Sequence, residues 1–469
     1  MRVLVVGGGG REHALVHSFV ESGLGPQVFC APGNAGIAAE ADCVPIGADD
    51  VAALLDFAAK ERPDLTVVGP EAPLVAGLAD LFRERGLRVF GPDAEAARIE
   101  GSKLFAKEVM GEAGAPTGGY SRHTTLESAL AALARHERYP VVIKADGLAA
   151  GKGVIIAQDE AEARAAVEDM LVRKTFGEAG NVVLIEEYLT GSEVSLLVLC
   201  DGEVAVPLAP AQDYKRIFAG DQGPNTGGMG SYCPVPGFEQ KAIDGAMDRV
   251  VEPVLAVLRR RGIAYRGVLY AGLIVSADGA RVLEFNCRFG DPETQAVLPR
   301  LRSDLLELCD AAARGELAGA TPAWTPQACV TVVLASAGYP ASSHKGDVIE
   351  GLDEAAAMDG VTVYHAGTAF AGHVADGGAT AGGAAAGPGG GAAGSGGAAA
   401  GPGAAGRDIV TAGGRVLAVS ALGDGFARAR ERAYEAVARI RFDGMQYRPD
   451  IAARAVRAEA GEISLFPAS

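Results

Sequence analysis

The sequence has 469 residues, 49% of them hydrophobic, so it can bury several cores, and we expect about three or four domains. Its formal net charge of -17 at pH 7 argues against a nucleic-acid partner, which requires a clustered basic face, but not against phosphate ligands, which need only local donors. The seven cysteines show no CxxC pair and no metal-ligand spacing, and no apolar run reaches the ~18 residues of a membrane span. We therefore expect a soluble, cytoplasmic protein with reduced thiols and no membrane partner.

The N-terminal region alternates short apolar strands with helical stretches. Strands are expected at residues 3–6, 28–30, 65–68 and 88–90, and helices at 51–60 and 74–85. This alternation predicts a doubly wound parallel sheet in a first domain, residues 1–101.

A glycine-rich turn, VVGGGGREHAL at residues 5–15, joins the first strand to a helix. Such a turn directs backbone N–H groups and the positive end of the helix towards an anion. Glu12 fills the third glycine position of a dinucleotide fingerprint, and the second strand ends without the acidic residue that would bind an adenosine ribose. A lone phosphate therefore fits better than NAD, and the alternative is a turn whose glycines serve only packing. Two further loops, APGN at 31–34 and VGPEAPL at 68–74, are expected at the same edge of the sheet, which suggests a small phosphorylated ligand.

The stretch VVIKADGLAAGKGVIIA, residues 141–157, resembles a phosphate-binding P-loop because its glycine-rich turn ends in Gly-Lys. A Walker loop needs four residues between its glycines and a Ser or Thr after the lysine. Here three residues separate Gly147 from Gly151, another glycine follows the lysine, and both flanks are typical of strands. The stretch is therefore predicted to form a glycine-rich β-hairpin that carries Lys144 and Lys152.

Carboxylates follow a predicted strand in VLIEEYLTGSEVS, residues 183–195, which is expected to form a strand, a short linker and a second strand. They belong to Glu186, Glu187 and Glu193. Carboxylates at the end of a strand are usually solvated, so this segment alone indicates little.

A second acidic segment, EFNCRFGDPETQ, predicts a metal site. Glu284 and Asn286 stand two residues apart on a predicted strand and hence on one face. A carboxylate and an amide oxygen are hard ligands suited to Mg²⁺ that carries nucleotide phosphates. Arg288 adds a cation on the same side if the strand continues. The alternative is that Glu284 simply pairs with a nearby lysine.

The segment PAQDYKRIFAGDQGPNTGGMGSY, residues 210–232, has neither helical nor strand periodicity. It contains charged groups and a glycine-rich end. It is expected to be a long ordered loop, and loops of this kind are usually functional.

The remaining residues, 321–469, predict a mixed α/β domain with strands at 331–335, 361–365 and 416–421 and a helix at 425–439. Within it, residues 372–406 are almost wholly Gly, Ala, Pro and Ser. Such a tract cannot bury enough apolar surface to order itself, so we expect a flexible surface loop that extends a hairpin. A linker between two separate domains is the alternative.

Taken together, EGSKLFAKE, VVIKADGLAAGKGV, IEEYLTGSEVS, PNTGGMG and EFNCRFGDPETQ resemble the ATP-grasp superfamily. With GGGREHAL, APGNAG and VGPEAPLVAG in front of them, their order closely resembles the phosphoribosylamine glycine ligase family of purine biosynthesis, over nearly the whole chain. The resemblance implies a central ATP-grasp domain at 102–320, in which residues from about 120 to 190 form a mobile lid. The departure from the family pattern is the tract at 372–406, which is longer than the usual loop.

The resemblance also implies a reaction. ATP, glycine and 5-phosphoribosylamine would give glycinamide ribonucleotide, ADP and phosphate through a glycyl phosphate, with Mg²⁺ or Mn²⁺ as the metal. The partners would be these small molecules, and we expect a monomer.

Matching the family motifs residue by residue implies individual roles. The residues expected to bind ATP are Lys103, Lys144, Gly147, Gly151, Lys152, Gly153, Glu186, Glu187, Leu189 and Glu193. Among them, the glycine hairpin would fold over the triphosphate, Glu186 would bind the adenine amino group beside the backbone near Leu189, and Glu193 would bind the ribose hydroxyls. Glu284 and Asn286 would hold the metal.

The other expected roles concern the reacting groups and the acceptor. Arg288, Asp213 and Lys215 would surround the reacting groups and act in catalysis. The residues expected to bind substrate are Gly9, Gly10, Glu12, Asn34, Pro70, Glu71, Asn225, Thr226 and Gly227, with Gly9, Gly10 and Asn34 at the phosphate of the ribosylamine.

Three alternatives to this function remain open. One keeps ATP-grasp chemistry and changes the acceptor, as in other carboxylate–amine ligases of purine biosynthesis. Another is a protein that binds ATP without turnover, against which the intact Glu284, Asn286 and Arg288 speak. A nicotinamide oxidoreductase is the least favoured because of Glu12.

Overall fold

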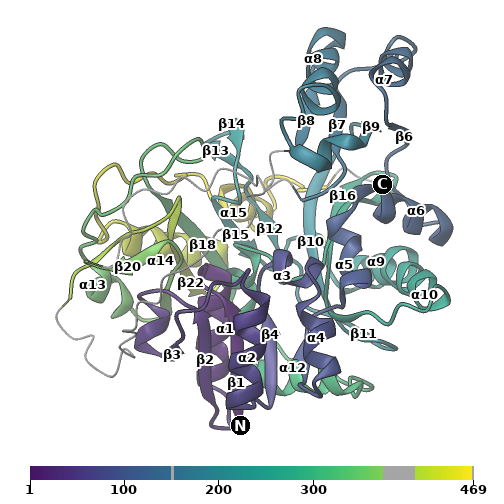
Figure 1. Cartoon of the computed structure of the whole chain (residues 1–469). Coiled ribbons are helices and arrows are strands. Elements are labelled where there is room, and N and C mark those ends of the chain that lie inside the picture. The colour runs from purple at the N-terminus through teal and green to yellow at the C-terminus, as the bar shows by residue number, and fades with distance from the viewer. Residues whose placement is uncertain (149–152, 373–406, 467–469) are drawn as a thin grey trace.

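The structure is a computed structural model that describes residues 1–148, 153–372 and 407–466 (Figure 1). The turn of the glycine-rich hairpin predicted at 141–157 and most of the Gly/Ala/Pro tract at 372–406 therefore lie outside the described residues. All seven cysteines lie inside them and are unpaired, as the sequence predicted.

The N-terminal region forms a parallel five-stranded sheet of order β3-β2-β1-β4-β5, which confirms the predicted doubly wound fold. Leu4 and Val6 of β1 pack into one core cluster and Val3 and Val5 into another, so both faces of the sheet are covered. The strands are β1 (Arg2–Gly7), β2 (Gln27–Pro32), β3 (Asp42–Cys43), β4 (Leu65–Val68) and β5 (Val89–Phe90). The helices are α1 (Gly10–Val20), η1 (Ile37–Ala39), α2 (Val51–Glu61), α3 (Glu71–Val75), α4 (Leu78–Glu84) and α5 (Ala94–Gly101).

The strand order of this sheet reverses between β1 and β4. The loops that leave the carboxyl ends of these two strands therefore diverge and open a crevice, which is where sheets of this kind bind ligands. The helix predicted at 74–85 is two helices, because Gly77 interrupts it with φ +87°.

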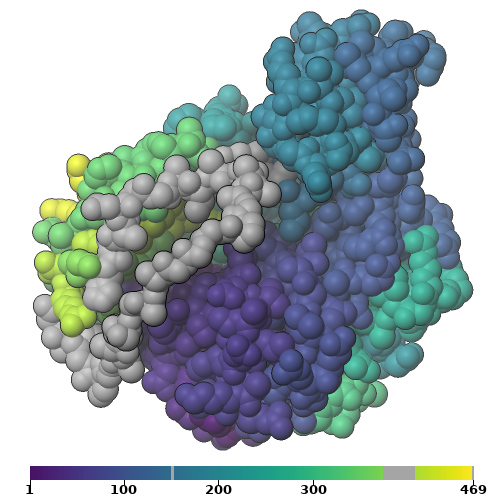
Figure 2. Space-filling view, viewed as in Figure 1, coloured from purple at the N-terminus to yellow at the C-terminus, as the bar shows by residue number. Residues whose placement is uncertain are grey.

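A small subdomain projects from the body of the molecule (Figures 1 and 2). Its antiparallel sheet has the order β6-β9-β7-β8, and α7 and α8 pack against one another beside it over a separate core cluster. The antiparallel pairing of β7 with β8 confirms the predicted hairpin. The elements are β6 (Tyr120–His123), α7 (Leu126–Leu133), β7 (Val141–Ala145), β8 (Val154–Ala157), α8 (Glu160–Leu171), η2 (Gly177–Asn181) and β9 (Val183–Glu187).

The central region is built on an antiparallel sheet of order β11-β10-β16-β17. Its long strands are apolar and buried, and helices cover them. The strands are β10 (Ser192–Asp201), β11 (Ala205–Pro207), β16 (Arg266–Ser276) and β17 (Gly279–Asn286). The helices are α6 (Lys103–Ala113), α9 (Gln240–Ala246), η3 (Met247–Val251), α10 (Glu252–Arg260), α11 (Glu293–Val297), η4 (Leu298–Arg300) and α12 (Leu305–Arg314).

A fourth sheet, of order β12-β15-β18-β22-β19, joins the middle of the chain to its C-terminal part. Two of its strands precede residue 320 and three follow it, so this sheet crosses the predicted boundary between the second and third domains, and that boundary stays a prediction. The strands are β12 (Gln212–Asp213), β15 (Gly230–Cys233), β18 (Ala328–Ala335), β19 (Val361–His365) and β22 (Arg415–Gly423). The helices of the C-terminal part are α13 (Leu352–Ala356), α14 (Phe426–Val437) and α15 (Ala453–Glu459).

The Gly/Ala/Pro tract is flanked by β20 (Thr368–Phe370) and β21 (Ile409–Thr411), which pair antiparallel. This pairing agrees with a tract inserted into a hairpin rather than a linker between domains. Residues 373–406 themselves lie outside the described part of the chain.

The expectation of an irregular loop at residues 210–232 was wrong. The segment contains β12, the hairpin of β13 (Arg216–Phe218) with β14 (Gln222–Asn225), and β15. Gly220 and Asp221 have φ of +68° and +55° and reverse the chain between the two hairpin strands. Strands this short carry too few residues for a period of two to be visible in the sequence.

Candidate active site

The glycine loop after β1 forms the first wall of the crevice. Glu12 closes the N-terminus of α1: its Oε2 accepts a hydrogen bond from the Gly9 N–H (2.7 Å) and its Oε1 accepts one from Arg11 Nε (2.6 Å). The Glu12 side chain is buried against the next loop of the sheet, because a Cβ on Gly69 would lie 2.0 Å from its Oε1. The predicted substrate residues Gly9, Gly10 and Glu12 thus lie together, but both oxygens of Glu12 are used inside the protein. Direct contact of Glu12 with a substrate stays a prediction.

Asn34 fastens the second loop to the first and to the C-terminal sheet. Its Nδ2 donates to the carbonyls of Gly8 (2.9 Å) and His365 (2.8 Å). Its Oδ1 accepts from the N–H groups of Gly36 and Ile37, both at 3.0 Å. Since the whole hydrogen-bonding capacity of the amide is used, Asn34 holds the shape of this edge, and its contact with a phosphate stays a prediction.

The third loop brings Pro70 and Glu71 to the predicted catalytic arginine. Pro70 precedes α3, and the Glu71 carboxylate lies 3.3 Å from Arg288 Nε. Arg288 also pairs with Glu100, at 3.0 Å, and donates to Asn286 Oδ1 at 3.3 Å. The strand does not continue to Arg288 as the sequence analysis considered, because β17 ends at Asn286. Burial would lower the pKa of Arg288, but the two carboxylates outweigh it and raise the pKa.

Glu284 lies half-buried among cations that come from separate segments. Burial would raise the pKa of this carboxyl, but the surrounding charges outweigh it and the net pKa is lowered, so Glu284 stays ionised. The cations are Lys215, Lys144, Lys103 and Arg288. Three of these cations also pair with other carboxylates: Arg288 with Glu71 and Glu100, Lys144 with Glu186, and Lys215 with Glu193. The cluster therefore has no excess of positive charge in this structure, but its cations converge on one carboxylate, an arrangement that suits a metal-bound phosphate.

The residues on this face of β17 also fit a divalent metal. Glu284 and Asn286 are two apart on the strand, as predicted, and offer a carboxylate and an amide oxygen. Across the described ranges, no group of three or more His, Cys, Asp or Glu side chains could hold a metal alone. A metal here would need oxygens from a ligand, which is how Mg²⁺ binds with substrate phosphates.

Asp213 and Lys215 form a second charged group beside Glu284. Lys215 Nζ lies 2.7 Å from Glu193 Oε2. Burial would lower the pKa of Lys215, but Glu193 and Asp213 raise it well above its usual value. Burial, assisted by Glu293, raises the pKa of Asp213 well above its usual value. Asp213 Oδ1 is buried, and within the described residues it has no hydrogen-bond partner.

The predicted adenine site centres on Glu186. Its Oε2 lies 3.0 Å from Lys144 Nζ and 3.1 Å from Lys107 Nζ. The sequence analysis missed Lys107, although it stands four residues after Lys103 in EGSKLFAKE and so on the same face of α6. The other oxygen, Oε1, is buried and finds no hydrogen-bond donor in the parts of the chain that the structure describes. Glu186 can therefore accept a hydrogen bond from a ligand.

The neighbouring Glu187 points to a different partner. Its carboxylate pairs with Arg281 at 2.7 Å and accepts from the Gly119 N–H at 3.1 Å. The hydrogen bond from Arg281 lowers the pKa of Glu187. Leu189 is buried just beyond the strand. ATP binding by Glu187 and Leu189 stays a prediction.

The glycine hairpin is described on both sides of its turn. Lys103 Nζ donates to the Gly147 carbonyl at 2.9 Å, which ties α6 to the start of the turn. The Gly153 carbonyl accepts from the Ala145 N–H at 2.9 Å. The predicted ATP-binding residues Gly151 and Lys152 lie outside the described residues.

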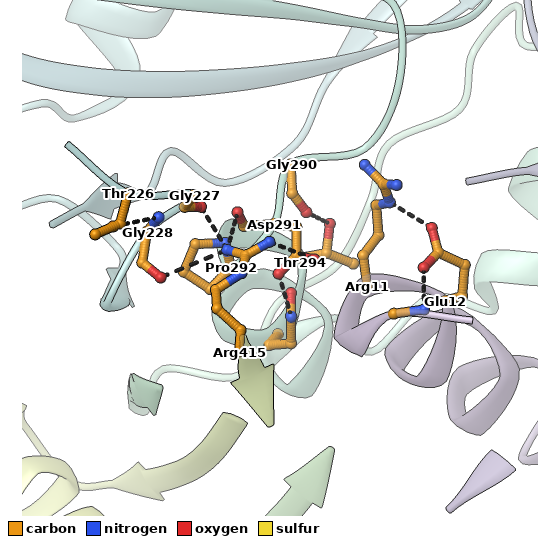
Figure 3. Close-up of polar contacts among 12 residues, drawn as sticks. Arg11, Glu12, Thr226, Gly227, Gly228, Gly290, Asp291, Pro292, Thr294 and Arg415 are labelled. Carbon is orange, nitrogen blue, oxygen red and sulfur yellow. Dashed lines mark hydrogen bonds and ion pairs between the residues drawn. The ribbon is translucent and has the colours of Figure 1, made fainter. Parts of the chain in front are cut away.

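A last wall forms where the 226–228 loop meets the 290–292 loop (Figure 3). Thr226 Oγ1 donates to the Lys215 carbonyl at 2.9 Å and accepts from the Gly228 N–H at 3.0 Å. Asn225 ends β14 opposite Arg216.

Arg415, which the sequence analysis missed, joins the two loops of this wall. Its guanidinium donates to the Gly227 carbonyl and to the carbonyl of Asp291 (2.9 Å), and its Nη2 lies 3.0 Å from Asp291 Oδ2. Burial would raise the pKa of Asp291, but Arg415 and Arg11 outweigh it and lower the pKa.

Models of the phosphoribosylglycinamide synthetase family match three successive parts of the chain. The N domain matches residues 1–100, the ATP-grasp (A) domain residues 101–294 and the C domain residues 329–454. Over 453 residues the chain is 44% identical to the phosphoribosylamine–glycine ligase of Caldanaerobacter subterraneus subsp. tengcongensis, covering 97% of this chain and 100% of that protein. It is 47% identical over 466 residues to the enzyme of the same name from Pseudomonas aeruginosa, covering 98% and 100%.

Solved structures agree in fold. The phosphoribosylamine–glycine ligase of Thermotoga maritima superposes with a TM-score of 0.76 at 31% identity, covering 96% of this chain and 100% of that one. Biotin carboxylase from Campylobacter jejuni superposes with a TM-score of 0.68 at 14% identity, over 97% of this chain and 98% of that one, which shows a shared fold alone. The chain therefore belongs to the phosphoribosylglycinamide synthetase, or phosphoribosylamine–glycine ligase, family of ATP-grasp ligases.

Proposed function

We infer that this chain is the ATP-dependent carbon–nitrogen ligase that joins glycine to 5-phosphoribosylamine in purine biosynthesis, giving glycinamide ribonucleotide, ADP and phosphate. The relatives named for this activity match nearly the whole chain. The structural observation that carries the inference is Glu284, a half-buried carboxylate on which four cations converge beside Asn286, an arrangement that suits a metal-bound triphosphate.

The chemistry has two steps, because a carboxylate is a poor acylating agent. The glycine carboxylate attacks the γ-phosphate of ATP, ADP leaves, and a glycyl phosphate forms. The amine of the ribosylamine then attacks the glycyl carbonyl and phosphate leaves. Since the protein forms no covalent bond, its contribution is positioning and charge neutralisation.

For the first step we assign the charges around Glu284. Glu284 and Asn286 would hold Mg²⁺ or Mn²⁺, which when bound supplies positive charge to the phosphate oxygens. Lys103 and Lys144 neutralise further phosphate charge. Arg288 positions the glycine carboxylate, which requires it to exchange one of its present carboxylate partners for the substrate.

For the second step we assign Asp213. An amine that becomes acylated must release a proton, and a base works best when its pKa lies near the working pH. The pKa of Asp213 is raised by burial, and its Oδ1 is a buried acceptor with no protein donor in the described residues. Asp213 accepts this proton, and the ammonium group of Lys215 holds the neighbouring Glu193 in place.

The phosphate end of the ribosylamine and the adenine end of ATP are assigned to two different parts of the site. We place the phosphate of the ribosylamine at the N-terminus of α1 beside Gly9 and Gly10, where the helix dipole favours an anion. Because the Gly9 N–H donates to Glu12 in this structure, it reaches the phosphate only when Glu12 releases that hydrogen bond. Asn34 keeps the adjoining loop in position. The free Oε1 of Glu186 accepts the adenine amino group.

The direct test is ADP release from Mg-ATP with ribosylamine generated in situ, with and without glycine, alanine and bicarbonate. Release that requires both glycine and the ribosylamine supports the proposal. Release with another acceptor would move the substrate assignment within the ATP-grasp ligases, and no release would favour a protein that only binds ATP. Replacing Mg²⁺ with Mn²⁺ identifies the preferred metal. We also propose a monomer that works in the cytoplasm, and light scattering tests the monomer.

A further inference from the structure

We propose that Arg415 is a positioning residue of this ligase. It holds the 226–228 loop and Asp291 in one fixed arrangement, and it thereby shapes the site for the sugar phosphate beside Gly9 and Gly10. The proposal rests on the proposed function, and it gives the C-terminal part of the chain a role in binding the ribosylamine.

The contacts of Arg415 join segments far apart in the sequence (Figure 3). Its Nη1 donates to the carbonyls of Gly227, Asp291 (2.9 Å) and Gly228 (3.5 Å), and its Nη2 pairs with Asp291 Oδ2 at 3.0 Å. Arg415 is the first residue of β22, which lies inside the five-stranded sheet between β18 and β19. A side chain that starts from a rigid strand can hold two loops in fixed register.

Two glycines let the 226–228 loop lie close against the side chains of Pro292 and Arg415. A Cβ on Gly228, whose φ is +111°, would lie 2.4 Å from Cδ of Pro292. A Cβ on Gly227 would lie 3.0 Å from Cζ of Arg415. Any displacement of the guanidinium is therefore transmitted directly to both loops.

Asp291 connects Arg415 to the glycine loop at Gly9 and Gly10 through Gln295. Its Oδ1 accepts from Gln295 Nε2 at 2.8 Å. Gln295 Nε2 lies 2.7 Å from the place that a Cβ on Gly10 would occupy, and Asp291 Oδ2 lies 3.7 Å from the corresponding place at Gly9. The chain of contacts from Arg415 thus ends at the N-terminus of α1, where we place the phosphate.

Gln295 supplies an independent sign of a ligand. The bond to Asp291 fixes which end of its amide is the nitrogen, so Oε1 is its acceptor. Gln295 is 1% exposed, and this oxygen has no hydrogen-bond partner among the residues that the structure describes. A hydroxyl or an amine N–H of the ribosylamine would satisfy it.

Charge gives Arg415 a second effect on the same site. Asp291 lies against the proposed phosphate site, and a carboxylate there repels an anion unless a cation neutralises it. Arg415 and Arg11 hold the pKa of Asp291 low, so the carboxylate is ionised and depends on these arginines for neutralisation. Removing Arg415 therefore weakens binding of the sugar phosphate more than binding of ATP or glycine.

The test compares Arg415→Ala, Arg415→Lys and a control, Arg428→Ala, whose partner Glu431 lies on the exposed side of α14. Kinetics with each substrate varied separately give kcat and three KM values, and thermal unfolding reports stability. For Arg415→Ala we expect KM for the ribosylamine to rise at least about tenfold, with KM for ATP and glycine within about twofold of wild type. Arg415→Lys keeps the positive charge but loses the several N–H donors of the guanidinium, so its KM for the ribosylamine should lie between those of wild type and Arg415→Ala. Arg428→Ala should match wild type.

A double variant separates charge from shape. If the unneutralised carboxylate is part of the cause, Asp291→Asn in the Arg415→Ala background should recover part of the affinity for the ribosylamine. An unchanged KM in Arg415→Ala, or an equal rise in all three KM values together with a lower unfolding temperature, would overturn the proposal. If Arg415→Ala does not fold, a normal ribosylamine KM in Arg415→Lys overturns it instead. The proposed function fails separately, when wild-type ADP release does not depend on the ribosylamine.

Discussion

The ammonium group of Lys107 lies 3.1 Å from Oε2 of Glu186, and both side chains are almost completely buried. Lys144 approaches the same oxygen to 3.0 Å. Two cations on one carboxylate oxygen fix the side chain and leave its other oxygen, which lacks a donor within the described residues, for a ligand. Burial lowers the pKa of Lys107.

Lys107→Met should therefore weaken ATP binding. It keeps the length of the side chain and removes the charge that orients Glu186. We expect KM for ATP to rise about tenfold with kcat little changed, and stability to fall by about 1–3 kcal/mol because a buried carboxylate loses one of its partners. Steady-state kinetics and thermal unfolding measure both effects. The exposed Lys60, changed to Met, is the control, and an unchanged KM for ATP in Lys107→Met would remove Lys107 from the adenine site.

Asp213→Asn tests the proton acceptor through the pH profile. Because burial raises the pKa of Asp213, the wild-type carboxyl takes up a proton at a higher pH than an ordinary aspartate, whose pKa is about 3.9. Turnover that needs the carboxylate therefore falls as pH falls through the raised pKa. Asparagine cannot accept the proton, so we expect turnover to drop by roughly 10²- to 10⁴-fold and the low-pH limb to vanish.

The matched control for Asp213→Asn is Asp244→Asn on the exposed side of α9. It should keep both the rate and the pH profile of wild type. A variant at Asp213 that retained the wild-type low-pH limb would show that another group is titrating.

Local patterns in the sequence predicted the parts of the site that lie within one element. Glu284 and Asn286 share a face because a strand has a period of two, and β7 pairs with β8 because apolar runs flank a glycine turn. The partners of Arg415, Asp291 and Gly227, stand 124 and 188 residues away in the sequence. A pattern of neighbouring residues therefore cannot predict these contacts. Such contacts exist only after β18 and β22 have joined the strands that precede residue 320. The sequence could not predict the buried ion pairs, such as those of Glu186 with Lys107 and Lys144, for the same reason.

Glu284→Gln should abolish metal-dependent turnover and leave the fold intact. Glutamine keeps the shape and an oxygen ligand but removes the negative charge, and the surrounding cations then repel a divalent ion. We expect turnover to fall by at least about 10³-fold and added Mg²⁺ no longer to tighten ADP binding in calorimetry. The exposed Glu203, changed to Gln, should behave as wild type. Near-normal activity in Glu284→Gln would take this residue out of the metal site.

The buried ring of His365 should make the stability of the protein depend on pH. It lies where β19 meets the glycine loops: its backbone N–H donates to His13 Nδ1 at 2.7 Å, and its ring is buried. Burial, and then the neighbouring His13, lowers the pKa of His365 to about 3. An unfolded histidine has a pKa of about 6.5, so between pH 6.5 and 3 the unfolded chain binds a proton that the folded protein does not. This group therefore removes stability as pH falls below about 6.5, at up to roughly 1.4 kcal/mol per pH unit.

His365→Asn removes this titration. The variant should be less stable than wild type at pH 7.5, because it loses packing, but its further loss between pH 7.5 and 5.0 should be smaller than that of wild type by about 2 kcal/mol. Thermal unfolding at the two pH values measures the difference. Glu40, whose pKa is lowered to about 2, loses its stabilising effect only in more acidic solution, so it does not obscure the comparison. Equal losses in the variant and in wild type would mean that His365 takes up its proton in the folded protein as readily as in the unfolded chain.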